Sequence, residues 1–226
     1  MGASVPRPSK EFANHQMPGV AVDIILFTVR HNELNAALVK REEDPYFGSY
    51  ALPGRFVRYD EKIEDTAKMA LKLKCGIDPS CVELHQLYTF GQNLDRDTRI
   101  RTISIVYIGI IGSDQIDFGA GTKITWHAAN HLPQLAFDHK QVVQYAVENL
   151  KKRLYTDLIA FSFLPHEFTL TQAQRTYEAI LGAKLDKRNF RKKMAELDIL
   201  TDTNKKLQEG VHRPAALYRF HRPKQV

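Results

Sequence analysis

The sequence of 226 residues predicts an α+β protein with two domains. Residues 19–137 contain a series of β-type apolar runs and one helical pattern, which together indicate a compact α/β domain. Residues 138–226 change to helical periodicity followed by a short two-stranded pattern, an order typical of a winged helix-turn-helix domain. Residues 1–18 contain three prolines and no periodicity, so we expect a flexible arm there.

The first domain begins with a predicted β-hairpin. Val20–Val29 is an apolar run rich in β-formers, and a turn at His31–Glu33 connects it to a second strand at Leu34–Lys40. A polar loop through Asp44-Pro45 follows. Further strands are expected at Val82–Phe90 and Thr102–Ile111, and as a hairpin across Gly119–Gly121 formed by Gln115–Phe118 and Lys123–Trp126.

Helical spacing appears at two places before the C-terminal region. The first helix is expected to end at Gly76, and its periodic positions are Ile63, Ala67, Ala70, Leu71 and Lys74. The second is an amphipathic helix of about four turns that Asp138 caps and that ends near Leu154. We expect this second helix to be the mechanical link between the two domains, because it joins them and carries an apolar face. Its alternative role is ordinary domain packing.

The C-terminal region has the order helix, helix, hairpin. A short extended piece at Leu158–Phe163 precedes a helix that Thr169 or Thr171 caps and that stops at Gly182. Asp186 caps the next helix, whose apolar stripe comprises Phe190, Met194 and Leu197. Leu200-Thr201 and Ala216–Phe220 then form a two-stranded ribbon, separated by a polar loop through Gly210.

Composition and charge narrow the classes of function. Residues 1–139 hold 15 Lys and Arg against 17 Asp and Glu, whereas residues 140–226 hold 17 against 9. This asymmetry indicates nucleic-acid binding, although a solvated basic face is the simpler explanation of charge alone. The longest apolar runs are too short to span a bilayer, and the N-terminus lacks the apolar core of a secretory signal. Because Cys75 and Cys81 suit a reducing compartment, we expect a cytoplasmic protein without membrane contact.

The predicted helix that Asp186 caps carries the densest positive charge of the C-terminal region. Phe190 points inward in the prediction, so the basic residues around it surround the exposed face. Arginine pairs with guanine, asparagine with adenine, and lysine neutralises phosphate, so these residue types suit major-groove binding. A solvated surface helix is the alternative, and Asn189 has capping as its other role. The predicted DNA-binding residues are Thr171, Gln172, Lys187, Arg188, Asn189, Arg191 and Lys192, with Arg213 in the wing.

One segment of the first domain resembles the Nudix box, G-x5-E-x7-R-E-U-x-E-E-x-G-U. Leu52-Pro53-Gly54-Arg55-Phe56-Val57 is followed by Glu61 and later by Gly76-Ile77. In that motif, glutamates one helical turn apart bind Mg²⁺, which activates water against a diphosphate linkage. The resemblance implies that the first domain is a Nudix-like α/β/α sandwich.

The residues at the metal-binding positions of this box have changed. Aligning Glu61 with the first glutamate places Arg55 at the glycine and puts Ala70, Leu73 and Lys74 at the three later glutamates. Because Mg²⁺ requires several oxygen ligands and Lys74 would repel it, we expect no metal site, no catalytic residue and no enzyme. Arg55 and Lys74 would instead hold the phosphates of a ligand without cleaving it, or are ordinary surface charges.

The whole chain resembles the Nudix-related transcriptional regulators, whose best-known branch represses NAD-biosynthesis genes and responds to ADP-ribose. The resemblance rests on the order and spacing of several segments over residues 20–220. These are Gln86–Phe90 with Arg96–Arg99, the Leu135–His139 junction, Asn189–Lys193, and Arg213–Ala215 with Leu217-Tyr218. Thr98 departs from the family pattern, in which proline stands at this position.

The resemblance implies a homodimer, a palindromic double-stranded operator and a sugar-nucleotide pocket in the Nudix domain. The effector it implies is ADP-ribose or a related nucleotide, with no cofactor required. Ligand binding would alter the relative placement of two winged helices. The predicted ligand-binding residues are Arg41, Phe47, Arg55, Lys74, Arg96 and Arg99, with Tyr46 as an alternative to Phe47 for stacking on adenine. Arg96 and Arg99 have ordering of their loop, or of the dimer, as the alternative role.

Two other functions stay open at this point. The first is an active Nudix hydrolase of ADP-ribose or a dinucleotide, with the C-terminal region as an accessory domain. The second is a regulator of the same family that responds to a pentose or its phosphate, because a changed pocket need not retain a nucleotide.

Overall fold

The computed structural model describes residues 16–115, 122–208 and 214–221, and they form two compact units. The first unit contains the described residues of 16–27, 36–110 and 122–146, and the second those of 28–35, 111–115 and 147–221. Most of the arm predicted for residues 1–18 lies outside the described residues. No helix in the described part of the chain is long and apolar enough to cross a membrane.

The first unit is built on a mixed sheet whose centre is β1 (Gly19–Arg30). Along its main path the strand order is β3 (Tyr50–Ala51), β2 (Glu33–Lys40), β1, β6 (Thr102–Ile110) and β5 (Leu84–Phe90). In addition, β4 (Gly54–Phe56) pairs with β1, and β7 (Ile124–Ala128) pairs with β2. Because β1 and β6 run parallel in the middle of the sheet, residues 22–27 are buried on both faces, which explains the continuous apolar run. The predicted first hairpin is confirmed.

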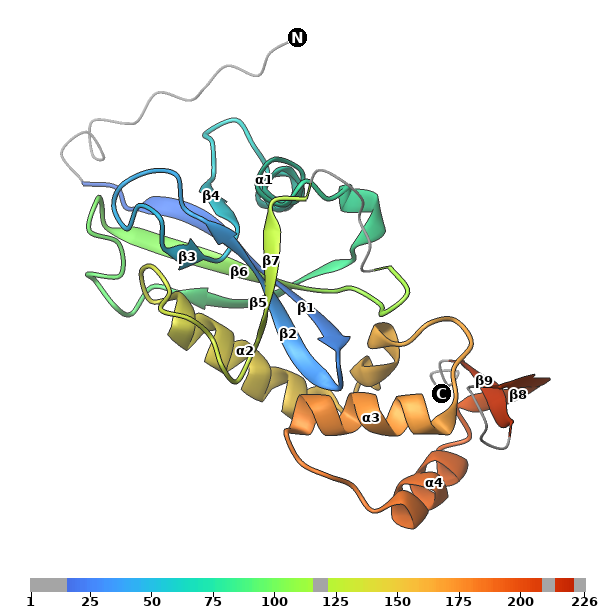
Figure 1. Cartoon of the computed structure of the whole chain (residues 1–226). Coiled ribbons are helices and arrows are strands. Elements are labelled where there is room, and N and C mark those ends of the chain that lie inside the picture. The colour runs from blue at the N-terminus through green and yellow to red at the C-terminus, as the bar shows by residue number, and fades with distance from the viewer. Residues whose placement is uncertain (1–15, 116–121, 209–213, 222–226) are drawn as a thin grey trace, which may run out of the picture. The chain divides into compact units, whose positions relative to one another are not determined.

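Two helices accompany this sheet and lie on opposite sides of it (Figure 1). One is α1 (Ile63–Ala70), which widens into a π-helical turn, η1 (Leu71–Cys75), and ends at Gly76 with a left-handed φ of 71°. The other is α2 (His139–Arg153), which begins in the first unit and ends in the second. A short 3₁₀ turn, η2 (Pro79–Cys81), precedes β5. The predicted helix ending at Gly76 is therefore confirmed, with its last turn in π form.

The second unit contains the helices and hairpin of a winged helix. Its elements are η3 (Ile159–Phe163), α3 (Leu170–Leu181), α4 (Lys187–Glu196), β8 (Leu200–Leu207) and β9 (Ala215–Phe220). Thr169 caps α3 in a capping box with Gln172, and Asp186 caps α4 by accepting the backbone N–H of Asn189. Both predicted caps are confirmed, with Thr169 rather than Thr171 at α3.

An aromatic core holds these elements of the second unit together. The rings of Phe161 and Phe220 stack with centroids 4.4 Å apart, which joins η3 to β9. Tyr177 of α3 contacts Phe190 of α4 edge to face at 5.3 Å, and both side chains are buried. The predicted inward direction of Phe190 and Met194 is confirmed, because both are at most 4% exposed.

Two local predictions were wrong, and a third is only partly covered by the described residues. The expected extended piece at Leu158–Phe163 is a 3₁₀ helix that starts after a left-handed Leu158, because the turn buries four apolar side chains together. The polar residues 202–207 belong to β8 rather than to a loop, because they pair with β9 across a bulge. The strand at residues 124–128 pairs with β2, and residues 116–118 of its predicted partner lie outside the described residues.

Candidate ligand pocket and nucleic-acid interface

The first unit contains a cavity of about 500 Å³ whose walls come from the sheet, the end of α1–η1 and the start of α2. Five of the six predicted ligand-binding residues line it: Arg41, Arg55, Lys74, Arg96 and Arg99. Phe47 does not line it, and its ring is 71% exposed. Seven cationic side chains line the cavity against four carboxylates, so the lining has a net positive charge.

Arg41 and Arg99 form the most ordered cationic part of the wall. Both guanidinium groups lie over the ring of Phe137, at 4.8 and 5.3 Å from its centroid, and Arg99 also lies 5.3 Å from the ring of Phe56. Arg41 donates to the backbone carbonyls of Pro45 and Glu43, at 2.7 and 3.1 Å. Burial, followed by the nearby charge of Arg99, lowers the pKa of Arg41. A phosphate at this wall would relieve that repulsion.

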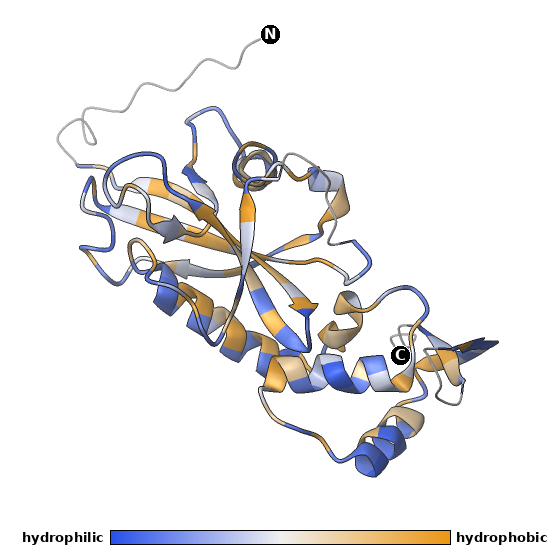
Figure 2. Cartoon of the chain, viewed as in Figure 1, coloured by the Kyte–Doolittle hydropathy of each residue, from blue (hydrophilic) through white to orange (hydrophobic). Residues whose placement is uncertain are grey.

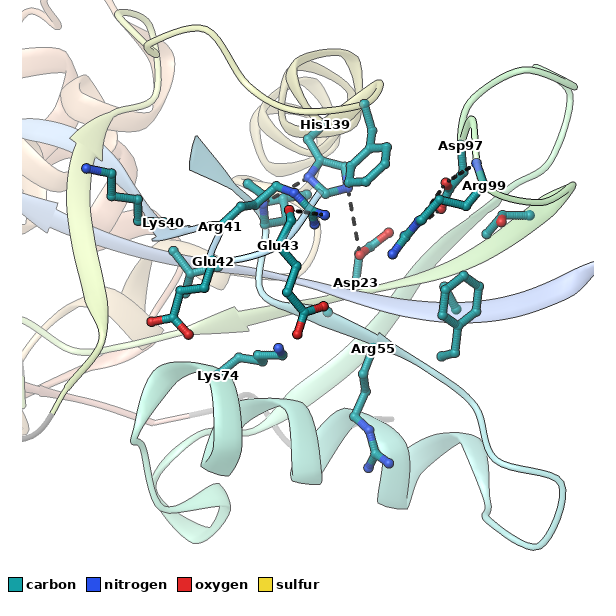
Figure 3. A pocket seen from close by; sticks show the side chains of 18 of the residues that line it. Asp23, Lys40, Arg41, Glu42, Glu43, Arg55, Lys74, Asp97, Arg99 and His139 are labelled. Carbon is teal, nitrogen blue, oxygen red and sulfur yellow. Dashed lines mark hydrogen bonds and ion pairs between the residues drawn. The ribbon is translucent and has the colours of Figure 1, made fainter. Parts of the chain in front are cut away.

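The residues of the Nudix box lie apart from this pair. Arg55 of β4 makes an ion pair of 2.8 Å with Glu61, the carboxylate aligned with the first glutamate of the motif. Figure 3 shows the Arg55 side chain directed toward α1, away from Asp23 and His139. Lys74, on the π-helical turn, is exposed and lines the cavity without an ion pair among the described residues. Arg55 is thus neutralised by Glu61, whereas Lys74 is available to a ligand.

Asp23 of β1 forms the acidic floor of the cavity. Its side chain is only 11% exposed and accepts a short hydrogen bond from the hydroxyl of buried Ser104. Gly54 passes directly beside it, because a Cβ at Gly54 would lie 2.2 Å from Asp23 Oδ1. Only glycine permits this close approach. The Leu52-Pro53-Gly54 segment therefore shapes the floor of the cavity.

The start of α2 adds residues that the sequence prediction did not place in the site. Asp138 was predicted to cap the helix, but its carboxylate forms a two-fold pair with Arg96, at 2.8 and 3.0 Å. Nδ1 of His139 accepts the backbone N–H of Leu52 at 2.9 Å, and its Nε2 lies 3.8 Å from Asp23. Burial lowers the pKa of His139, with the nearby Asp23 carboxylate opposing the shift. The segment 135–139 matches the family pattern, but no local pattern in the sequence assigns its side chains to a cavity.

This arrangement suits a ligand with both phosphates and hydroxyl groups. Guanidinium and ammonium groups bind phosphate oxygens with charge-assisted hydrogen bonds. Asp23, Glu42 and Glu43 offer carboxylate oxygens that accept hydrogen bonds from sugar hydroxyls. Within the described residues, no group of three His, Cys, Asp or Glu side chains is placed to hold a metal ion.

The second unit presents a different kind of surface on α4. Figure 2 shows this helix as almost wholly hydrophilic beside its two buried apolar residues. The exposed side chains include all of the predicted DNA contacts of this helix, namely Lys187, Arg188, Asn189, Arg191 and Lys192. Only Lys192 has a carboxylate within 4 Å among the described residues, and that is Glu196 at 3.8 Å. Lys187, Arg188 and Arg191 therefore have no carboxylate partner among the described residues and can neutralise phosphates.

The other predicted DNA contacts have mixed positions. Thr171 is exposed at the start of α3, whereas the side-chain oxygen of Gln172 accepts the backbone N–H of Thr169 at 2.7 Å. Arg213 lies outside the described residues. Lys193, which was not predicted to touch DNA, has its ammonium 3.4 Å from the centroid of the Tyr155 ring.

Comparison with known proteins identifies the family of the chain. The NrtR DNA-binding winged helix domain matches residues 160–220. The ADPR responsive transcriptional repressor NtrR of Acinetobacter baylyi is 33% identical over 215 residues, covering 92% of this chain and 84% of that protein. The chain belongs to the NrtR family of Nudix-fused winged-helix regulators.

Solved structures of this family agree in fold. Shewanella oneidensis NrtR complexed with a 27mer DNA superimposes with a TM-score of 0.76 at 32% identity, covering 89% of this chain and 93% of that chain. The Nudix domain of the same NrtR complexed with ADP ribose has a TM-score of 0.51 at 30% identity, covering 64% and 99%. The predicted α+β fold with a Nudix-like domain and a winged helix is confirmed.

The Nudix part of the chain also has a relative among enzymes. The ADP-ribose pyrophosphatase of Methanocaldococcus jannaschii is 32% identical over 139 residues, which cover 61% of this chain and 78% of that protein. This chain is thus similar to a hydrolase over 61% of its length and to a repressor over 92% of its length.

Proposed function

We propose that this protein is a transcriptional repressor that binds operator DNA through α4 and the wing, and binds ADP-ribose in the cavity of its Nudix domain. One observation carries the proposal: a cation lines the cavity at a position where the Nudix box places a metal ligand, and a second cation pairs with the box glutamate that remains. Lys74 lines the cavity at such a position, and Arg55 pairs with the remaining box glutamate, Glu61. A pocket of this kind holds a diphosphate by charge and does not assemble a metal around it.

The cavity matches the chemistry of ADP-ribose. The diphosphate would lie against Arg41, Arg99 and Lys74, whose charges face the cavity. Asp23 and Glu43 would accept hydrogen bonds from ribose hydroxyls. Arg96 serves chiefly to order the wall, because its side chain is only 3% exposed and pairs with Asp138. The similarity to an NrtR Nudix domain that was crystallised with ADP ribose supports the same ligand.

The DNA-binding part of the proposal rests on α4. Its exposed cations and Asn189 would enter the major groove, while Arg213 would contact the backbone beside it. We further propose a homodimer on a palindromic operator, because two-fold symmetry places two such helices on successive turns of one DNA face. The regulated genes would belong to NAD metabolism, since ADP-ribose is a product of NAD turnover.

The competing function is hydrolysis of ADP-ribose, which the similarity to the archaeal pyrophosphatase favours. Incubation of the full-length protein with ADP-ribose and Mg²⁺ separates the two functions. We expect no release of AMP above the level of a Glu61→Gln variant. Mg²⁺-dependent AMP release that Glu61→Gln abolishes would establish the enzyme instead.

The direct test of the repressor is a gel shift with the promoter next to its own gene. We expect a retarded complex at low salt, and a change in its affinity when ADP-ribose is added in the presence of EDTA. Parallel lanes with NAD and with arabinose distinguish a nucleotide effector from a sugar effector. Absence of a complex at low salt would refute the proposal.

A further inference from the structure

Three consecutive residues at the start of α2 each contact a different part of the ligand cavity. Phe137 and His139 line the cavity directly, and Asp138 binds Arg96, which also lines it. The chain reaches this point from an anchored segment, because the backbone N–H of Ala136 donates to the carbonyl of Tyr50 at 2.8 Å. The segment Phe137–His139, which we call the junction triplet, therefore connects the cavity wall to the first turn of α2.

Phe137 holds a backbone conformation that its side chain does not favour. Its φ is 56°, in the left-handed region, and such a conformation persists in a non-glycine residue only where the surroundings impose it. The surroundings here are the two cavity arginines, Arg41 and Arg99, over the ring, and Tyr46, whose ring centroid lies 5.0 Å away. A phosphate that engages both arginines competes with the ring for the same guanidinium groups. Ligand binding thus acts on the forces that maintain this backbone conformation.

Asp138 and His139 fasten the helix to the cavity on two further sides. Both side-chain oxygens of Asp138 are used by Arg96, and the pair is almost completely buried, at 9% and 3% side-chain exposure. The same Arg96 approaches Asp23 on the cavity floor at 3.8 Å. His139 accepts the backbone N–H of Leu52, which lies directly before the Pro53-Gly54 turn. Removing one partner of a buried pair leaves the other uncompensated, so these contacts fix the position of the helix start.

The helix that begins here is continuous through fifteen residues. It contains neither proline nor glycine, the usual positions of a kink, so we expect it to move as one piece rather than bend at its start. Its last residues belong to the second unit, which carries α4. A displacement at the junction triplet would therefore reach residues of the second unit along one helix.

We infer that the junction triplet converts occupancy of the cavity into a displacement of α2, with Asp138 as the positioning residue that couples Arg96 in the cavity wall to the helix. This inference rests on the proposed function, because it assumes that one chain binds both an anionic effector and DNA. The role assigned to the triplet is coupling rather than binding. We expect its loss to reduce the effect of the bound ligand on DNA affinity more than it reduces the affinity for the ligand or for DNA.

Asp138→Asn tests the coupling. The variant keeps the size of the side chain and removes its charge, and Asp157→Asn is the matched control, because Asp157 pairs with Arg153 at the other end of α2 at 2.6 Å. The DNA affinity of each full-length protein is measured by fluorescence anisotropy on a duplex selected with the wild-type protein. DNA affinity is measured once without ADP-ribose and once at an ADP-ribose concentration that calorimetry shows to saturate that variant. Weaker ligand binding therefore does not affect the ratio of the two DNA affinities.

The ratio of the DNA affinity with ADP-ribose to the DNA affinity without it decides whether Asp138 couples the two sites. We expect ADP-ribose to change the affinity of the wild type and of Asp157→Asn at least fivefold, a typical size for coupling between sites. In Asp138→Asn the change should fall below twofold. An undiminished ratio in this variant would overturn the inference and leave the proposed function intact. A wild type that ignores ADP-ribose would overturn the proposed function itself.

A second measurement covers the case in which Asp138→Asn does not fold. Amide hydrogen exchange of the wild-type protein is followed with and without saturating ADP-ribose. We expect a change in protection at residues 137–143 and no change at residues 84–90 of β5, which lie outside the cavity lining. Unchanged exchange at residues 137–143 while calorimetry shows bound ADP-ribose would contradict the inference.

Discussion

The cavity and helix α4 are both rich in positive charge, but they use it in opposite ways. In the cavity, Arg55, Arg96 and Arg99 each pair with a carboxylate, and Arg41 is held by backbone carbonyls. On α4, Lys193 contacts the Tyr155 ring, whereas the other cations are exposed, and their only carboxylate neighbour within 4 Å among the described residues is Glu196. Paired, oriented charges select a ligand by its geometry, whereas free charges on a helix attract a polyanion of regular spacing. The difference teaches that net charge alone does not distinguish the two kinds of site.

The largest effect is expected when three cations are removed from α4, which should affect DNA binding and leave the cavity unchanged. We expect DNA affinity to fall by about 100- to 1000-fold, and the salt dependence of log K to weaken by roughly 0.9 per lost phosphate contact. ADP-ribose affinity should not change. The variant combines Lys187→Gln, Arg188→Gln and Arg191→Gln. A control that removes the same charge from exposed positions on and beside α1 combines Lys62→Gln, Lys68→Gln and Lys72→Gln. Equal loss in both variants would show that net charge, rather than α4, binds DNA.

The second prediction removes a cation from the cavity instead of from α4. Arg41→Gln should weaken ADP-ribose binding about 10- to 100-fold in calorimetry, since a charge-assisted hydrogen bond contributes about 1.5–3 kcal/mol. DNA affinity without ligand should change far less than in the α4 variant, because Arg41 contacts the junction triplet at Phe137 and lies outside α4. Arg58→Gln is the control, because Arg58 is exposed and outside the cavity lining. Unchanged ADP-ribose affinity in Arg41→Gln would remove this residue from the site.

The third prediction concerns the stability of the cavity floor. Gly54→Ala should lower the free energy of unfolding of the protein by about 1–3 kcal/mol, because the added methyl group would overlap Asp23 Oδ1 and the backbone oxygen of Val22. Gly91→Ala is the control, since a Cβ there would lie 3.5 Å from Ile103, an ordinary contact. Denaturant unfolding measures both variants. Equal stability of the two would mean that the floor adjusts without strain.

The smallest expected effect is a pH dependence of stability from His139. Burial lowers the folded-state pKa of His139 below its ordinary value of 6.5, so the unfolded chain binds more protons as the pH falls. The free energy of unfolding should therefore decrease below about pH 6.5. His139→Asn, which retains an acceptor for the Leu52 N–H, should reduce this slope.

Two other histidines complete that experiment. His127 contributes in the same direction, because burial also lowers its pKa, so His127→Gln measures its separate share of the slope. His166→Asn changes an exposed histidine and serves as the control. A slope in His139→Asn equal to that of the wild type would assign the whole pH dependence to other groups.

Local patterns in the sequence determined most of the elements of this protein. The apolar run that became β1, the left-handed Gly76 after the π-helical turn, and the caps Thr169 and Asp186 depend on neighbours within a few residues. The basic face of α4 was predicted for the same reason, because helical spacing alone determines which side chains surround a buried Phe190. The order of the two domains followed from the same patterns, and the family resemblance indicated it as well.

The cavity depended on contacts that no local pattern contains. Arg96 and Asp138 are 42 residues apart, and His139 accepts a hydrogen bond from Leu52, 87 residues earlier. Asp138 looked like a helix cap because capping is a local property, and only the folded chain shows that a distant arginine takes its carboxylate. The sequence by itself therefore determined most of the helices and strands and the exposed charge, which follow from short-range periodicity and capping. Tertiary structure alone decided which charges are paired and buried, because pairing depends on which distant segments the sheet brings together.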